Sequence, residues 1–241
     1  MAVYDGSKVL DAIRSLKQAE TVESVLARFQ DFASLYGFEK LFVGQLVNPA
    51  NVPDSQTLFA TNWPTELRNQ RRSKMAILSD PIALCALRTT RPFRWEEAIQ
   101  HASRQGRRVV DMARDYGIND GFMFPVHGLY TVPGGVSLGG ADLDLAPQEI
   151  SEVELVSQTL YAQLEELLGP FPYQEMVDLT YREAEVVQFA AAGKTNLEIA
   201  QILDIRQDTV KKTLKRASEK LGTTNRAHTV ATAIAKRVIF G

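Results

Sequence analysis

The chain has 241 residues, enough for one large domain or two unequal ones, and its composition is that of an ordinary globular protein. No apolar run approaches the ~18 residues of a membrane-spanning helix, and the N-terminus lacks the basic and apolar regions of a signal peptide. A single cysteine, Cys85, excludes an internal disulfide and a cysteine-based zinc site. Together these features predict a cytoplasmic protein with no membrane partner.

The net charge of −2 hides an asymmetry between two parts of the chain. Residues 176–241 carry 11 Lys and Arg against 7 Asp and Glu, a net charge of +4, whereas the remainder carries a net charge of −6. A basic C-terminal third on an acidic body is typical of a DNA-binding module that is carried by a domain with another task.

Residues 1–168 mix helical and strand-like patterns. Apolar residues at helical spacing predict helices, and runs of β-branched and aromatic residues between Gly and Pro predict strands. The helices are expected at residues 7–36 (as a pair), 64–72, 82–87, 95–99, 103–116 and 147–168. The strands are expected at residues 40–47, 56–61, 122–127, 129–132 and 136–140. Because the strands follow each other through glycine turns more than through helices, this order favours an α+β fold, an α/β/α sandwich with an antiparallel sheet.

A break in the helical pattern at Gly169-Pro170-Phe171-Pro172 marks a domain boundary. We therefore expect a first domain at residues 1–168, a linker at 169–175 and a second domain at 176–241. A body of 168 residues can enclose a small pocket as well as a core.

The second domain is expected to be a small all-α fold of four helices. Two capping boxes, each a Thr followed three residues later by a Glu, mark helix starts at Thr180 and Thr195. The segment from Thr195 to Leu221 then has the pattern of a helix-turn-helix. The apolar side of its first helix is expected from Leu197, Ala200, Ile202 and Leu203.

The recognition helix of this motif is expected at Gln207–Leu221. Its buried stripe would be Val210, Leu214, Ala217 and Leu221, which recur at i, i+4, i+7 and i+11. Lysine and arginine side chains lie on its other side, although a solvated basic helix in any helical domain has the same pattern. The last helix carries small apolar residues on one face, which is typical either of a core or of a two-fold contact between two copies.

Four short motifs stand out in the second domain. They are Leu179-Thr180-x-Arg182-Glu183-x-Glu185-Val186, Gly193-Lys194-Thr195-Asn196-x-Glu198-Ile199-Ala200, Thr209-Val210-Lys211 and Lys220-Leu221-Gly222. The first domain adds Asn62-x-Pro64, Asp80-Pro81, Pro92-Phe93-x-Trp95 and Tyr116-Gly117-x-x-x-Gly121-x-x-x-Pro125. These motifs resemble the DNA-binding domain and the autoinducer-binding domain of quorum-sensing LuxR regulators. The resemblance implies a dimeric, ligand-regulated transcription factor, with RNA polymerase as a further candidate partner.

The ligand of this family is an N-acyl-homoserine lactone, held between the sheet and one helical layer. By resemblance, Asp80 is the carboxylate that accepts the ligand amide N–H, and Trp95 is the aromatic wall beside the lactone ring. The same residues fit a purely structural alternative, since Asp80 before Pro81 is a good N-cap and Trp95 suits a core.

The expected pocket departs from the family pattern at three positions. The helix before Asp80 usually carries Tyr, Trp and Tyr four residues apart, and here Trp63, Leu67 and Arg71 stand in their places. Leu67 has no hydrogen-bond donor, and Arg71 is a permanent cation that an apolar pocket disfavours unless it is paired. We therefore hypothesise an atypical ligand or ligand independence. Apart from such a ligand, no cofactor is expected.

The expected DNA contacts lie on the recognition helix and just before the helix that precedes it. Lys211 and Lys215 share a face one turn apart, so we expect them to reach base edges in the major groove. Phosphate contacts are expected from Lys194, Thr195, Asn196, Lys212 and Arg216, and the family motif adds Thr209. A two-fold dimer would place two such helices ~34–36 Å apart on an inverted repeat in double-stranded DNA. Arg206 replaces the usual Ser, so the recognition helix is expected to start nearer Asp208.

Three other functional classes are alternatives. An enzyme is disfavoured because the histidines are scattered, Cys85 lies in no motif, and neither a phosphate-binding loop nor metal-ligand spacing occurs. No catalytic residue and no metal ligand is therefore expected. A phosphorylation-controlled regulator is disfavoured because the body lacks an acidic pair after an early strand and a later strand-end lysine. An orphan interaction module, which would pair with a related regulator and block it, stays open.

Overall fold

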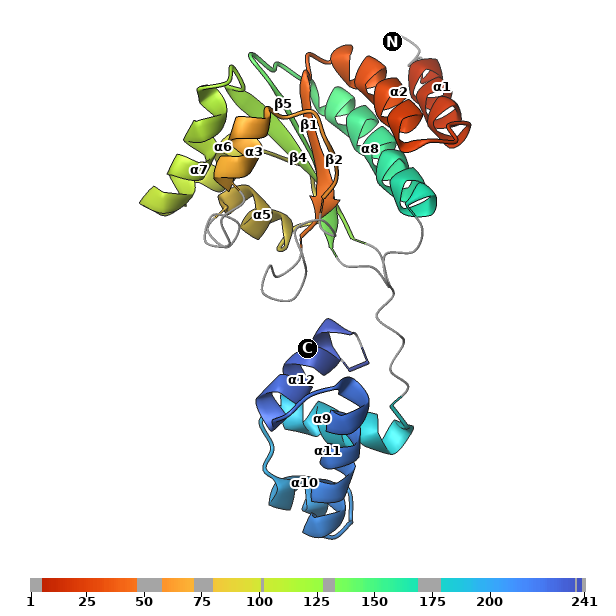
Figure 1. Ribbon diagram of the computed structural model, residues 1–241, viewed down its shortest axis with the longest axis vertical. Helices are drawn as coiled ribbons and strands as arrows, with labels where there is room; N and C mark the ends of the chain where they lie inside the picture. The colour runs from red at the N-terminus through yellow and green to blue at the C-terminus, as the bar shows by residue number, and fades with distance from the viewer. Residues whose placement is uncertain are drawn as a thin grey trace. The chain divides into compact units, whose positions relative to one another are not determined.

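The computed structural model describes residues 6–46, 58–71, 80–100, 102–127, 133–168, 179–236 and 238–239, without the side chains of residues 58, 59, 69–71 and 109. The chain divides into two compact units, Met1–Phe171 and Pro172–Gly241. Figure 1 shows the helices and strands of both units. The strand expected at residues 129–132 and the linker expected at 169–175 lie outside the described residues.

The first unit follows the expected order of helices and strands. Its elements are α1 (Ser7–Lys17), α2 (Val22–Ser34), β1 (Lys40–Gln45), β2 (Leu58–Thr61), α3 (Thr65–Arg71), α5 (Pro81–Ala86), β3 (Phe93–Arg94), α6 (Trp95–Gln100), α7 (Arg104–Arg114), β4 (Asp120–Val126), β5 (Gly134–Gly140) and α8 (Pro147–Leu167). The two-residue strand β3 is an addition that the sequence did not predict, because it is too short to show a period.

The described strands form one antiparallel sheet in the order β2-β1-β5-β4-β3. Helices α1, α2 and α8 cover one face of the sheet, and α3, α5, α6 and α7 cover the other (Figure 1). This arrangement confirms the expected α+β fold, an antiparallel sheet between two helical layers.

The side chains of the central strands alternate between two cores. Leu41, Leu138 and Phe122 are cross-strand neighbours in the core beneath α1, α2 and α8. In the next row of the ladder, Ser137 pairs with Met123, which belongs to the core on the other face. Because successive side chains of a strand point to opposite faces, both faces of this sheet are apolar and buried. Ser137 is the polar exception in its row.

A buried carboxylate of α8 is joined to α1 and to the turn that follows α2. Glu152 of α8 is 3% exposed, accepts a hydrogen bond from the Tyr36 hydroxyl, and lies 2.9 Å from the Lys8 Nζ. Burial and the hydrogen bond to Glu152 raise the pKa of Tyr36 to about 12. Because a buried carboxylate requires donors, this network fixes the three helices of one layer against each other.

The second unit is a small all-α fold, as the sequence predicts. Its described helices are α9 (Tyr181–Ala191), α10 (Asn196–Ile202), α11 (Gln207–Leu221) and α12 (Arg226–Ala235). The two predicted capping boxes are present, with Thr180 at the start of α9 and Thr195 at the start of α10.

The predicted apolar side of α10 is partly wrong. Leu197 and Ile202 are 55% and 49% exposed, whereas Ile199 and Ala200 are buried in a cluster with residues of α9 and α11. At 100° per residue, Leu197 lies on the opposite side of the helix from Ile199, and Ile202 is the last helical residue. A helix of two turns therefore docks through Ile199 and Ala200, and the predicted Leu203, its C-cap residue, is partly buried against the same cluster.

We expect Tyr36→Phe to lower the free energy of unfolding of the first unit by about 1–3 kcal/mol, because Glu152 would stay buried with one donor fewer. Both tryptophans of the chain, Trp63 and Trp95, lie in this unit, so urea unfolding followed by tryptophan fluorescence reports on it alone. Tyr116→Phe is the matched control, because Tyr116 is a half-buried tyrosine beside the other core. Removal of the Tyr116 hydroxyl should change the free energy of unfolding of the first unit by less than about 0.5 kcal/mol. Equal effects of the two substitutions would contradict the role given to the network.

Candidate functional site

The helix α11 starts at Gln207, and the expectation of a start nearer Asp208 is wrong. Arg206 is the N-cap residue although its side chain makes no capping hydrogen bond, so backbone geometry alone starts the helix. Asp208 lies in the first turn, where a carboxylate suits the positive end of the helix dipole. Gly222 ends the helix with a left-handed φ of +66°, which favours glycine.

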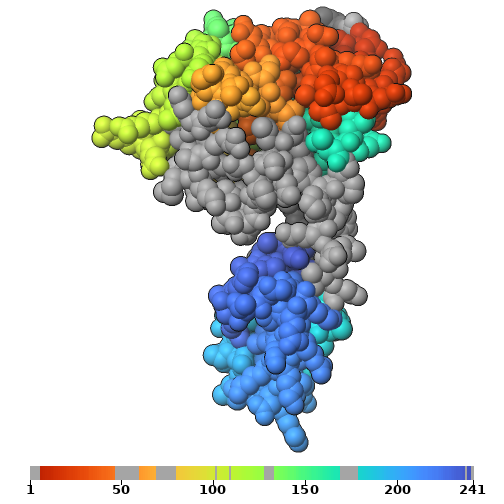
Figure 2. Space-filling model, in the orientation of Figure 1, coloured from red at the N-terminus to blue at the C-terminus, as the bar shows by residue number. Residues whose placement is uncertain are grey.

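One side of α11 is buried and the other side carries its cations. The buried residues are Val210, Thr213, Ala217 and Leu221. Leu214, also predicted to be buried, is partly buried between two apolar clusters. The predicted cations Lys211, Lys212, Lys215 and Arg216 are all exposed. Figure 2 shows α11, in mid-blue, on the visible face of the second unit.

The two lysines predicted to contact bases have only weak partners within the protein. The side chains of Lys211 and Lys215 are 59% and 79% exposed, and each Nζ lies 3.8 Å from a carboxylate, that of Asp208 or Glu219. Exposed pairs at this distance contribute little to stability. The ammonium groups are therefore available to an external anion or base.

A buried carboxylate anchors the far end of α11. Glu183 of α9 is 5% exposed and lies 2.7 Å from the Nζ of Lys220, in the last turn of α11. The same carboxylate accepts a hydrogen bond of 2.8 Å from the Thr180 backbone N–H. Desolvation would raise the pKa of the Glu183 carboxyl, but the bonds from Lys220 and Thr180 outweigh it and hold the pKa below its ordinary value.

The turn before α10 contains three predicted phosphate-binding residues. The Thr195 hydroxyl and backbone N–H both donate to Glu198, at 2.8 and 2.7 Å, which lowers the pKa of Glu198. Lys194 and Asn196 are half-buried, and both accept hydrogen bonds from Arg226, the first residue of α12. Thr195 therefore shapes the turn, while Lys194 and Asn196 are held from a second helix.

Thr209 is exposed on the first turn of α11, and its carbonyl accepts the Thr213 hydroxyl at 2.8 Å. The hydroxyl of Thr213 is thus satisfied within the helix, and the residue is buried. Thr213 supports α11 from inside, whereas the Thr209 side chain stays accessible.

The structure brings three of the predicted ligand residues into one core. Trp63, Leu67 and Trp95 are all at most 5% exposed and belong to the apolar cluster between the sheet and the α3–α7 layer. The rings of Trp63 and Trp95 meet edge to face, with centroids 6.1 Å apart, and Phe42 packs on Trp63 at 5.9 Å. Trp63, Leu67 and Trp95 were predicted to lie together by family resemblance alone.

Trp95 is held by two features of the neighbouring strands. Its indole Nε1 donates a hydrogen bond of 3.2 Å to the Ser137 Oγ on β5. A Cβ built on Gly121 of β4 would lie 2.3 Å from Trp95 Cε2, so only glycine lets the indole lie against that strand. Ser137 was not among the predicted site residues, although it is a single polar residue in the apolar, glycine-rich strand β5.

Asp80 has the capping role that the sequence offered as an alternative. It is the N-cap of α5, and its Oδ1 accepts the backbone N–H groups of Ile82 and Ala83 at 2.9 and 3.4 Å. Ile82 belongs to the same apolar cluster as Trp95, so α5 places Asp80 at the start of a helix that packs on that cluster. The side chain of Arg71 lies outside the described ones.

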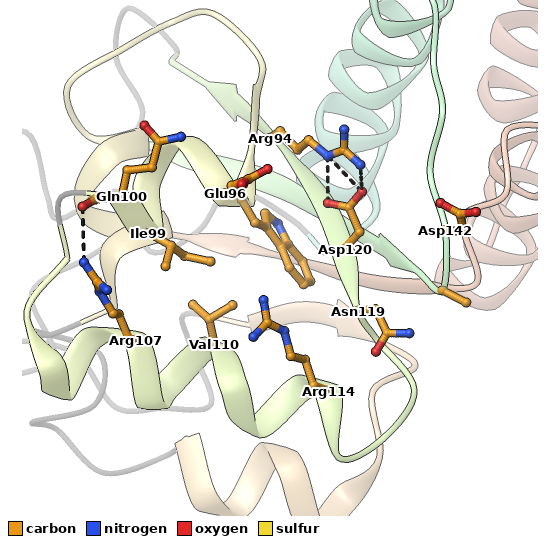
Figure 3. A pocket seen from close by; sticks show the side chains of 12 residues that line it. Arg94, Glu96, Ile99, Gln100, Arg107, Val110, Arg114, Asn119, Asp120 and Asp142 are labelled. Atoms are coloured by element: carbon orange, nitrogen blue, oxygen red, sulfur yellow. Dashed lines mark hydrogen bonds and ion pairs between the residues drawn. The ribbon is translucent and has the colours of Figure 1, made fainter.

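A hollow of about 650 Å³ lies between α6, α7 and the start of β4. Arg107, Val110 and Arg114 of α7 lie along one side, and the paired Arg94 and Asp120 lie at another (Figure 3). Among its described lining residues, Trp95 is the one that was also predicted for the ligand. The hollow is therefore on the outer side of that core and does not unite the predicted ligand residues.

No group of three or more His, Cys, Asp or Glu side chains among the described residues is placed to hold a metal ion. None of the described helices combines the length and the apolarity that crossing a bilayer requires.

Comparison with known proteins agrees with this geometry. The autoinducer binding domain matches residues 21–164, and the domain of bacterial regulatory proteins of the luxR family matches residues 177–233. The chain belongs to the LuxR family of bacterial regulatory proteins. As a LuxR-family member it is a quorum-sensing transcriptional regulator with an autoinducer-binding domain and a DNA-binding domain, and the resemblance found in the sequence is confirmed.

Individual relatives extend over nearly the whole LuxR-family chain. The transcriptional activator protein BjaR1 of Bradyrhizobium diazoefficiens is 34% identical over 240 residues, which cover 99% of this chain and 98% of that protein. The quorum sensing-dependent regulator RpaR of Rhodopseudomonas palustris is 30% identical over 231 residues, covering 95% and 93%. The crystal structure of Escherichia coli SdiA has the same fold, with a TM-score of 0.64 at 21% identity over 98% and 99% of the two chains. The matched relatives are transcription regulators, so this LuxR-family chain is not an enzyme.

We expect the stability that Glu183 contributes to this regulator to depend on pH. Since folding lowers its pKa, the contribution is complete above the ordinary value of 4.5 and is lost as the pH falls from there through the folded pKa. At pH 7, Glu183→Gln should lower the free energy of unfolding of the second unit by about 1–3 kcal/mol, because Lys220 and Thr180 lose an ionised acceptor. Below pH 4.5 the variant and the wild type should converge.

Urea unfolding followed by far-ultraviolet circular dichroism measures this effect, while tryptophan fluorescence follows the first unit separately. Glu219→Gln is the matched control, because that carboxylate is 64% exposed and 3.8 Å from its lysine. The control should unfold like the wild type at pH 7. A Glu183→Gln variant that also did so would show that the anchor is not needed.

Proposed function

We propose that this LuxR-family protein binds an inverted-repeat operator as a homodimer, in a sequence-specific manner, through α11. The observation that supports this most directly is the face of α11 on which Lys211, Lys212, Lys215 and Arg216 are all exposed, opposite a buried apolar stripe. Cations on the solvent face of a docked recognition helix are what a duplex phosphate backbone and major groove require.

The roles within this surface follow from position. Lys211 and Lys215 are one turn apart on one side of the helix, so we assign them to base edges. Lys212, Arg216, Lys194 and Asn196 are assigned to phosphates, and Thr209 is accessible beside them. Thr195 contributes to phosphate binding by shaping the turn, since both of its donors serve Glu198.

The exposed apolar side of α12 supports the homodimer. Thr229 and Ala233 of this helix are buried, whereas Ala227 and Ala231 are exposed and Ile234 is 39% exposed. A stripe of small residues lets two helices approach closely, and a two-fold contact of this kind would pair two recognition helices. Sequence periodicity left the face of Ala227, Val230, Ala231, Ile234 and Val238 open between core and dimer. Val230 and Val238 pack against the apolar core of the unit, whereas the exposed Ala227, Ala231 and Ile234 are the part of the face that supports the dimer.

The first unit is proposed to sense a small molecule in or beside the cluster of Trp63, Leu67 and Trp95. Asp80 and Arg71 are the further ligand candidates from the family pattern. Leu67 is fully buried and carries no donor, so the lactone carbonyl of an ordinary acyl-homoserine lactone would lack the partner that the family provides. This favours an atypical ligand or ligand independence. Ligand binding would act by favouring the dimer that fits DNA.

Domain limits, location and partners complete the proposal. We place the ligand-binding and dimerisation domain at residues 1–168, the linker at 169–175 and the DNA-binding domain at 176–241. The location is cytoplasmic, because that is where bacterial operators lie. RNA polymerase is the further partner if the protein activates transcription. The alternative is an orphan that forms a mixed dimer with a related regulator and prevents it from binding DNA.

We expect Lys211→Ala to cost about 1–3 kcal/mol of operator affinity and to relax sequence preference, because a base contact would be lost. The measurement is fluorescence anisotropy of duplexes that the wild type selects from a random pool, together with mismatched duplexes. Lys212→Ala is the matched control and should weaken all duplexes equally, since it would lose a phosphate contact. Uniform weakening by Lys211→Ala would remove its base-reading role, and isolation only as a mixed dimer unable to bind DNA would favour the orphan alternative.

We also expect common straight-chain acyl-homoserine lactones not to bind with nanomolar affinity, since Leu67 offers their lactone no donor. Titration followed by fluorescence of Trp63 and Trp95 measures binding directly, because both indoles lie in the proposed site. Native mass spectrometry of protein purified from cells tests for a retained molecule of another kind. Nanomolar binding of a straight-chain lactone would refute the atypical pocket and leave the DNA-binding proposal intact.

A further inference from the structure

Arg226 reaches from the start of α12 to the turn that precedes α10. Its Nη1 donates a hydrogen bond of 2.8 Å to the Asn196 Oδ1, and its Nη2 donates to the Lys194 carbonyl oxygen. These partners lie 30 and 32 residues earlier in the chain. The bonds connect α12 to two residues that are assigned above to DNA phosphates.

Arg226 does not stabilise its own helix. It is the first residue of α12, where the positive end of the helix dipole disfavours a cation. The N-cap of α12 is already formed by Asn225, whose Oδ1 accepts the His228 backbone N–H at 2.9 Å. The favourable interactions of the guanidinium are therefore those with the turn before α10.

The bond to Asn196 determines which end of its amide faces outward. A guanidinium has only donors, so the atom of Asn196 that faces Arg226 must be the oxygen. The Nδ2 group, with its two hydrogens, is then on the other side of the amide. A phosphate has only acceptors, so it needs the Nδ2 side of Asn196. Arg226 thus holds Asn196 in the orientation that suits a phosphate.

The bond to the Lys194 carbonyl immobilises the rest of the turn. Gly193 has a left-handed φ of +80°, and the Lys194 N–H donates to the Phe189 carbonyl at 3.1 Å. The capping box of Thr195 holds the other side. With Arg226 as the third attachment, the turn is ordered before any anion arrives, which reduces the ordering cost of binding.

We propose that Arg226 is a positioning residue for DNA binding: it orients Asn196 and fixes the Lys194 backbone so that this turn accepts a phosphate of the operator. The inference rests on the proposed DNA-binding function and deepens it. Arg226 acts through its two neighbours, and its forked geometry is essential to this role. A lysine would keep the charge but could not bind both acceptors in the same plane.

The experiment compares Arg226→Lys, Asn196→Ala and the double variant in the full-length protein, with the duplex that the wild type selects. Arg226→Lys should weaken binding about fivefold to tenfold, although the positive charge is retained. The double variant should bind more tightly than the product of the two single losses predicts, because both changes remove the same Asn196 contact and only the Lys194 attachment is lost in addition. A second double-mutant cycle combines Arg226→Lys with Lys215→Ala. Its double variant should lose affinity by the product of the two single fold-losses, since Lys215 acts independently on α11.

A second variant separates positioning from folding. Asn196→Asp keeps an oxygen for Arg226, so thermal unfolding by circular dichroism should not fall. It presents a carboxylate in place of the Nδ2 donors, so binding should weaken more than in Asn196→Ala. An Asn196→Asp variant that bound like the wild type would overturn the inference.

Other outcomes also distinguish the explanations. If Arg226→Lys binds like the wild type, or if its effect multiplies with that of Asn196→Ala, Arg226 does not act through Asn196. If Arg226→Gln lowers the slope of log affinity against log salt by ~0.9 while Arg226→Lys leaves affinity unchanged, Arg226 contacts a phosphate itself. If the wild type binds no duplex, the proposed function fails and the inference falls with it.

Discussion

The second unit depends on one buried carboxylate. Glu183 caps α9 through Thr180 and receives Lys220 from the last turn of α11, so the recognition helix is attached to α9 by charge as well as by apolar packing. A buried carboxylate is tolerated only with such partners, and here they come from two helices. A cation in the last turn also suits the helix dipole. The anchor thus uses one lysine of α11, and the remaining cations stay in solvent.

Arginine and lysine have different tasks in this protein. Several guanidinium groups bind backbone carbonyls between segments remote in sequence: Arg94 binds Leu143, Arg182 binds Leu203 and Arg226 binds Lys194. Lys211 and Lys215 of α11 instead extend into solvent with weak partners. A planar fork can hold two acceptors at once, whereas a flexible ammonium can follow an external anion. In the second unit, arginine thus fixes backbone carbonyls, and Lys220 is the lysine of α11 that serves an internal ion pair. The outward charge of α11 comes largely from its other lysines.

The first unit has two cores, and they differ in polarity. The core beneath α1, α2 and α8 is closed by the network around Glu152, whereas the core on the other face contains two tryptophans and the buried Ser137. Trp95 already has Ser137 as its hydrogen-bond partner, and Leu67 is fully buried. A ligand in this core would have to exchange some of these contacts for its own. Ligand sensing by this unit would therefore change the packing of the core that contains the two tryptophans. The core beneath α1, α2 and α8 would meanwhile hold the sheet in place from its other face.

Much of the fold followed from local patterns. Capping boxes at Thr180 and Thr195, glycine stops and apolar spacing specified most of the helices, including the end of α11 at Gly222, because a helix closes its hydrogen bonds within four residues. The antiparallel sheet followed from short apolar runs between glycine turns. Only tertiary structure decided that Ile199 rather than Leu197 is buried, that Trp95 meets Ser137, and that Arg226 reaches the turn before α10. These features join segments that are far apart in the chain, and no local period encodes which distant partner a side chain will contact.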